Sequence, residues 1–136
     1  MQILRTLIAI IIGLFIGSVV NMSLVKLGGF VFPLPDNLDA SKMEDLKAAF
    51  SSLDWFHFIF PFLAHALGTL SGVIIALLIS DDHKKISSFT IAIFFFGGGV
   101  VVNLYMLPSP IVFTILDLGL AYIPMAILAN RWMIKD

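Results

Sequence analysis

The stretch PFLAHALGTLSG, which runs from Pro61 to Gly72, places an ionisable histidine, His65, inside a long apolar segment. Small residues recur every four positions around this histidine, at Ala64, Gly68 and Gly72. Because a helix turns about 100° per residue, these positions share one face, and Thr69 lies on the same face. Small residues let helix backbones approach closely within lipid. The pattern therefore predicts a membrane helix that packs tightly against a neighbour.

The composition of the whole chain agrees with a membrane location. Of its 136 residues, 60% are hydrophobic and 12% are charged, and the mean hydropathy is +1.05. A soluble domain carries about 25% charged residues, so too little polar surface is present to cover a water-facing globule. The net charge of −1 gives no indication of a nucleic-acid partner. The absence of cysteine excludes disulfides, thiolate metal sites and thiol catalysis.

Four apolar segments are long enough to cross a bilayer, for which about 20 helical residues suffice. They run over residues 3–27, 55–80, 86–107 and 111–129. The first is too long for a signal peptide and no Ala-x-Ala-like site follows it, so we expect an uncleaved span. The predicted fold class is all-α, a single integral membrane domain over residues 1–136 that forms a four-helix bundle.

The basic residues predict the orientation of the bundle, because cytoplasmic loops are enriched in Lys and Arg. One side would carry Arg5, Lys84, Lys85, Arg131 and Lys135, and the other Lys26, Lys42 and Lys47. The sequence thus predicts a multi-pass protein of the cytoplasmic membrane with both termini in the cytoplasm. The difference of five against three leaves a dual or reversed topology open.

The long outer loop, residues 28–54, contains a second helical pattern. Ser41 and Glu44 have the spacing of a capping box. Apolar residues then follow at helical spacing, at Met43, Leu46, Phe50 and Leu53. This predicts a short amphipathic helix over about 42–53 that rests on the membrane or across the mouth of the bundle. A simple connecting segment is the alternative.

Two further spans carry small-residue positions. Gly13, Gly17 and Asn21 form a four-residue stripe in the first span, and the third span contains Gly97, Gly98 and Gly99. Together with Gly68 and Gly72, these glycines are predicted to pack helices closely, either within one bundle or in a dimer of bundles. Pro61 and Pro124 lie within apolar spans, where each is expected to kink its helix.

Each span also contributes one strongly polar side chain at a similar depth. Counted along the spans, His65, Asp117, Asn21 and Asn103 fall within a layer about 10 Å thick in the outer half of the membrane. Because hydrocarbon penalises isolated polar groups, these side chains should face inward and pair, with His65 close to Asp117. The cluster, with Thr69, is either a proton-responsive or solute-binding site or a set of structural hydrogen bonds between helices.

Other chemistries find little support in the sequence. Haem held between helices needs histidines on two helices, whereas His57 and His65 share one and His83 falls in a loop. A zinc site of His57, His65 and Asp117 is strained, because eight helical residues span about 12 Å. We therefore expect no metal and no cofactor.

The segments FIFPFLAHALGT (58–69), LPSP (107–110) and Asp117 followed by YIPMA (122–126) resemble a group of small four-span proteins of bacterial membranes. The resemblance covers the whole chain and implies a four-helix bundle in a bacterial cytoplasmic membrane. The group has no assigned activity, so the resemblance implies no catalytic residue.

Three functions remain. The leading prediction is a non-enzymatic membrane protein, an accessory or structural subunit of a homo-oligomer or of a larger membrane complex. The alternative is a small proton- or cation-coupled transporter or channel-like protein that uses His65 and Asp117. A membrane enzyme acting on lipid or quinone would have only those same two residues as candidates.

Overall fold

The computed structural model describes residues 1–36, 38–39, 41–50 and 52–134. Lys135, one of the five cations assigned above to the cytoplasmic side, lies outside the described residues, as does position 51 of the helix predicted over 42–53. The elements are α1 (Gln2–Val31), α2 (Met43–Phe50), the 3₁₀ turn η1 (Trp55–Phe58), α3 (Ile59–Ile79), α4 (Lys84–Val101), the π-helical turn η2 (Val102–Met106), α5 (Ile111–Leu120) and α6 (Ile123–Met133).

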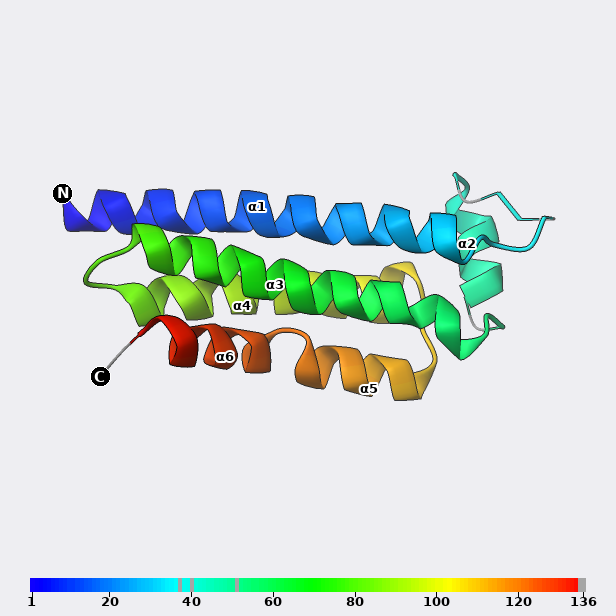
Figure 1. Cartoon of the computed structure of the whole chain (residues 1–136). Coiled ribbons are helices and arrows are strands. Elements are labelled where there is room, and N and C mark those ends of the chain that lie inside the picture. The colour runs from blue at the N-terminus through cyan, green and yellow to red at the C-terminus, as the bar shows by residue number, and fades with distance from the viewer. Residues whose placement is uncertain (37, 40, 51, 135–136) are drawn as a thin grey trace.

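The predicted all-α fold class is confirmed. Four helical segments are long and apolar enough to cross a membrane, over Gln2–Val31, Trp55–Ile79, Lys84–Met106 and Ile111–Met133. They run side by side as an antiparallel bundle, with both termini at one end and α2 at the other (Figure 1). At about 1.5 Å per residue, the 30 residues of α1 extend about 45 Å, more than the ~30 Å hydrocarbon layer.

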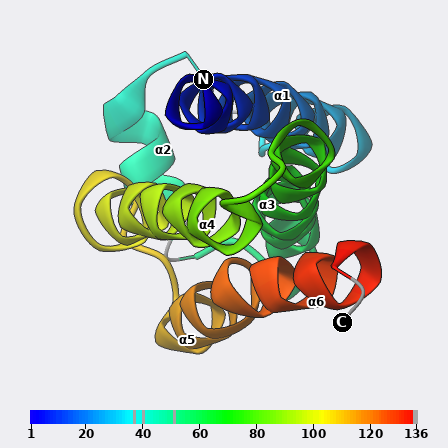
Figure 2. The same cartoon turned by 90° about the vertical axis from the view of Figure 1, so that its left-hand side faces the viewer.

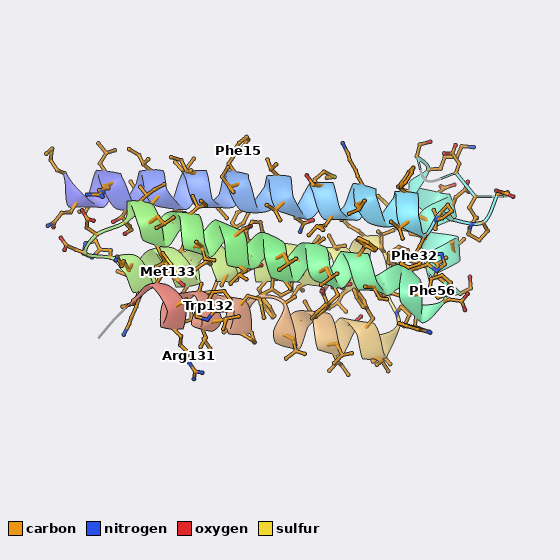
Figure 3. All side chains as sticks on the ribbon, in the orientation of Figure 1. Phe15, Phe32, Phe56, Arg131, Trp132 and Met133 are labelled. Carbon is orange, nitrogen blue, oxygen red and sulfur yellow. The ribbon has the colours of Figure 1, made fainter. Side chains whose placement is uncertain are left out.

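The bundle is organised around α3, which contacts α1, α4, α5 and α6. Viewed from the end that carries the termini, α1 and α6 lie on opposite sides of the bundle (Figure 2). The main core cluster consists mostly of small residues: Ala9, Val73, Ala76, Leu77, Ile91, Ala92, Ala126 and Ala129. Large apolar side chains such as Phe15, which is 66% exposed, point away from the bundle (Figure 3). Small residues inside and large ones outside suit helices that are surrounded by lipid.

The fourth span consists of two helices. It was expected as one run over 111–129, but α5 ends at Leu120 and α6 begins at Ile123. Pro124 lies in the first turn of α6, where its missing N–H costs nothing, so the chain restarts there after an interruption at Ala121 and Tyr122. Pro61 similarly falls in the first turn of α3 and not in a helix interior, where it would kink the helix.

The outer loop starts its helix differently from the capping box predicted for Ser41 and Glu44. The Ser41 hydroxyl donates to Asp39 Oδ1 (2.6 Å), and α2 begins at Met43. That hydrogen bond and one from the Ser41 backbone hold the pKa of Asp39 below its usual range. At the other end of α2, the ring of Phe50 packs edge-on against Phe58 of η1 at 5.3 Å between centroids, which joins α2 to the end of the bundle.

Candidate functional site

A histidine and a carboxylate meet in the interior of the bundle. His65 on α3 and Asp117 on α5 are 52 residues apart in sequence, and Nδ1 of His65 lies 2.8 Å from Oδ1 and 2.9 Å from Oδ2 of Asp117. The Asp117 side chain is fully buried, and the His65 side chain is 14% exposed. The structure therefore brings together the two ionisable groups that the depth argument placed in one layer.

Asn103 reaches the same carboxylate from the third span. Its Nδ2 donates to Asp117 Oδ2 at 2.7 Å, and its Oδ1 accepts a hydrogen bond from the hydroxyl of Ser109 at 3.0 Å. Asn103 lies on η2, where Leu107 N–H bonds to the carbonyl of Val102 five residues earlier. A π-helical turn of this kind changes the direction in which side chains point and often occurs at functional sites.

The interruption in the fourth span supplies another donor. The hydroxyl of Tyr122 donates to Asp117 Oδ2 at 3.2 Å, and the Tyr122 side chain is 1% exposed. Its ring lies 5.6 Å from that of His65, centroid to centroid. Gly99 on α4 makes room for this tyrosine, because a Cβ at Gly99 would collide with the Tyr122 hydroxyl.

We call His65, Asn103, Asp117 and Tyr122 the Asp117 network. Its three donors come from α3, from η2 and from the break between α5 and α6. A carboxylate that carries no proton only accepts hydrogen bonds, which suits the convergence of three donors on Asp117. Because Nδ1 of His65 faces the carboxylate, it is Nδ1 that carries the proton when His65 donates to Asp117. The network thus links the second, third and fourth spans through one side chain.

Two predicted site residues lie outside these hydrogen bonds. Thr69 is 1% exposed and lies one turn from His65 on α3, but its hydroxyl has no hydrogen-bond partner among the described residues. Asn21 is half-buried and packs on α3, where a Cβ on Gly68 would lie 3.0 Å from the Cβ of Asn21. Asn21 therefore takes part in the contact between α1 and α3 and is not a member of the Asp117 network.

The predicted packing glycines divide into two groups. Gly13 and Gly17 of α1 face Gly72 and Gly68 of α3, and a Cβ at any of the four would lie 2.6–2.9 Å from a carbonyl oxygen of the opposite helix. By contrast, a Cβ on Gly97 or Gly98 would meet nothing within 4 Å. The first four glycines are needed for the contact between α1 and α3, whereas Gly97 and Gly98 lie on an open face of α4.

A second polar contact region, nearer the termini, was not predicted from the sequence. Asn130 Nδ2 on α6 donates to Ser88 Oγ on α4 at 2.7 Å, and the hydroxyl of Ser87 donates to that of Ser80 at 3.2 Å. Serine and asparagine are too common at helix ends to stand out, so no signal in the sequence singled them out. Tyr122 was also missed as a site residue, although the nearby Pro124 signals the break that positions it.

The Asp117 network is largely buried, with the Asp117 side chain fully buried and that of His65 14% exposed. Four pockets among the described residues are lined by other side chains and by no member of the network. A groove of about 540 Å³ lies between α3 and α5 and is lined by apolar side chains, including Trp55, Phe62 and Leu116. Among the described residues, no group of three or more His, Asp or Glu side chains is placed to hold a metal ion.

Comparisons with known proteins give no relative from which a role could be transferred: no protein-family model, no curated protein and no solved structure matches this chain.

Proposed function

We propose that this chain is a small non-enzymatic membrane protein that acts as an accessory or structural subunit, in a homo-oligomer or in a larger membrane complex. The observation that carries the proposal is the Asp117 network, in which one buried carboxylate accepts from donors on three other parts of the bundle. Such hydrogen bonds hold helices in register, and each contributes about 0.6–2 kcal/mol in membranes.

The burial of the network supports a structural role. A solute site needs a path from water, and the main pockets of the described chain lie elsewhere. The outward faces of the bundle, by contrast, offer area for a partner. Gly97 and Gly98 leave the backbone of α4 uncovered next to exposed Phe94 and Val101, and small residues on a lipid-facing helix allow another helix to approach.

The proposal includes the orientation of the protein in its membrane. The end of the bundle that carries both termini is where α1 and α4 begin and α6 ends (Figure 1), and the helix bounds place there Arg5, Lys84, Lys85 and exposed Arg131. The opposite end holds α2, with Lys47, and the end of α1, with Lys26. Basic residues favour the cytoplasmic side, so we place both termini in the cytoplasm. The bacterial membrane rests on the sequence resemblance alone.

Purification of the full-length protein from its native membrane in mild detergent tests the subunit role. We expect the wild-type protein to purify with a stoichiometric partner or as a discrete homo-oligomer. A variant that carries both Gly97→Leu and Gly98→Leu should lose this association. A Gly29→Leu variant is the matched control, since a Cβ at Gly29 also meets nothing within 4 Å. A wild-type protein that purifies only as a monomer, without a partner, contradicts the proposal.

Proton- or cation-coupled transport is the second candidate, and two observations favour it. The fourth span is interrupted about one helical turn after Asp117, at Ala121 and Tyr122, and some transporters bind ions at broken helices. Thr69 also presents a buried hydroxyl that has no hydrogen-bond partner among the described residues, one turn from His65. Flux of protons and of Na⁺ or K⁺ into vesicles that contain the purified protein tests this function. Flux that His65→Ala abolishes supports transport, and flux equal to that of protein-free vesicles rejects it.

A further inference from the structure

A pocket of about 310 Å³ opens between the ends of α4 and α6 on the side of the bundle that carries both termini. Its lining residues are Lys85, Phe89, Ile127, Asn130, Arg131 and Ile134. None of these residues belongs to the Asp117 network, and neither the subunit role nor transport uses the pocket.

The two cations of this pocket have no counter-ion among the described residues of the protein. Among the described residues, Lys85 and Arg131 form no ion pair, and no acidic side chain lines the pocket. Asp81 and Asp82 of the neighbouring loop line an adjoining pocket that shares Lys85, and Asp81 pairs with Arg5. Arg131 projects outward from α6 (Figure 3). Two cations in one pocket without an acid attract an anion.

The pocket changes from charged to apolar with depth. Lys85 lies in the first turn of α4 and Arg131 in the last turn of α6, so both are near the ends of their spans. Phe89 and Ile127 each lie four residues deeper, which is about 6 Å along a helix. Charge at the membrane surface above apolar side chains matches a phospholipid, whose phosphate lies at the surface and whose acyl chains run inward. A free phosphate ion would gain nothing from the apolar floor.

Hydrogen bonds hold the two helices that form this pocket together. Asn130 Nδ2 donates to Ser88 Oγ of α4 at 2.7 Å and to the carbonyl of Ala126 at 2.9 Å, which holds α6 against α4 beside the pocket. Trp132, which is 58% exposed, is the next residue after Arg131 and is of the type that anchors helices at the interface. The pocket is therefore placed at the depth of lipid head groups.

We propose that this pocket binds the phosphate head group of an anionic phospholipid from the leaflet on the side of the termini, with Lys85 and Arg131 contacting the phosphate. Basic pockets between membrane helices bind anionic head groups in this way. The inference is independent of the proposed function, because the protein could bind this lipid as a subunit or as a transporter.

The test uses full-length, delipidated protein in a neutral detergent. Phosphatidylglycerol and phosphatidylcholine with the same acyl chains are added separately, and binding is followed by native mass spectrometry and by the shift in melting temperature. We expect phosphatidylglycerol to bind and to raise the melting temperature, and phosphatidylcholine to do so much less. Raising the salt concentration should weaken phosphatidylglycerol binding to the wild-type protein, a readout that requires no variant.

Variants locate the site. Lys85→Gln and Arg131→Gln should each weaken the apparent affinity for phosphatidylglycerol by about fivefold, whereas Arg131→Lys should keep most of it. Lys84→Gln is the matched control, because it removes the same charge next to Lys85 but does not line this pocket. It should change the affinity less than twofold.

Three results would overturn the proposal. Equal binding of the two lipids would show that the head group is not recognised. If Lys84→Gln weakened phosphatidylglycerol binding as much as Lys85→Gln does, the lipid would be attracted by the positive charge of the surface in general and not by this pocket. Finally, if inorganic phosphate at the same concentration reproduced the melting shift, the pocket would bind a free anion and not a lipid.

Discussion

The contact between α1 and α3 makes a quantitative prediction for Gly17→Ala. A Cβ at Gly17 would lie 2.6 Å from the carbonyl oxygen of Gly68, whereas ordinary contact begins at 3.4 Å. The two helices would have to separate by 3.4 − 2.6, or about 0.8 Å, at this point. Overpacking of a tight interface typically costs about 1–3 kcal/mol of the free energy of unfolding.

Gly29→Ala in the same helix is the matched control, because a Cβ there meets nothing within 4 Å. Gly29→Ala raises the helix propensity as Gly17→Ala does, which stabilises the folded protein by at most about 1 kcal/mol, but it causes no collision. Unfolding of both variants by dodecyl sulfate in mixed micelles, followed by circular dichroism, gives the two free energies. We expect Gly17→Ala to be about 1–3 kcal/mol less stable than Gly29→Ala. Equal stabilities of the two variants would refute the close packing of α1 on α3.

Three further substitutions test individual side chains by the same unfolding measurement. Tyr122→Phe removes only the hydroxyl that Asp117 accepts, and should lower the free energy of unfolding by about 0.6–2 kcal/mol; no loss would exclude this bond from the network. Thr69→Val replaces a buried hydroxyl without a described partner, and should be neutral or stabilising by about 1 kcal/mol; a clear loss of stability would reveal a partner for that hydroxyl. Asp81→Asn breaks an exposed ion pair with Arg5 and should cost less than about 1 kcal/mol at low salt; a larger cost would mean that this pair fixes the ends of α1 and α3.

Much of the bundle could be predicted from the sequence because hydrocarbon imposes simple conditions. Four apolar runs of sufficient length indicated four helices, and the depth of each polar residue along its run placed His65 and Asp117 in one layer. That layer is where their side chains meet, at 2.8 Å. The glycine stripe of α1 and that of α3 were also visible, because a period of four residues defines one helix face.

The remaining parts of the site depend on where helices are interrupted. On a continuous helix, Tyr122 would point about 140° away from Asp117, since five residues turn about 500°. Only the break before Ile123 brings its hydroxyl to the carboxylate. Asn21 belongs to the stripe of α1 that packs on Gly68 of α3, so its side chain takes part in that contact and not in the Asp117 network.

Local geometry also separates residues that look alike in sequence. The three consecutive glycines of α4 cannot be told apart in the sequence. In the structure, Gly99 makes room for the Tyr122 hydroxyl, whereas a Cβ at Gly97 or Gly98 would meet nothing within 4 Å. The rotation of α4 decides which of them faces inward. Similarly, the spacing of Ser41 and Glu44 predicted a capping box, but the Ser41 hydroxyl points toward the preceding loop, where it donates to the charged acceptor Asp39, and α2 begins at Met43.

The most direct test of the structural role of the Asp117 network is one paired measurement on Asp117→Asn. The variant keeps the shape of the side chain but leaves donors of His65, Asn103 and Tyr122 facing an amide. We predict a loss of about 2–5 kcal/mol in the free energy of unfolding, together with ion flux in vesicles of wild-type protein no greater than in protein-free vesicles. A wild-type flux that Asp117→Asn abolishes, with the free energy of unfolding unchanged, would contradict the structural role.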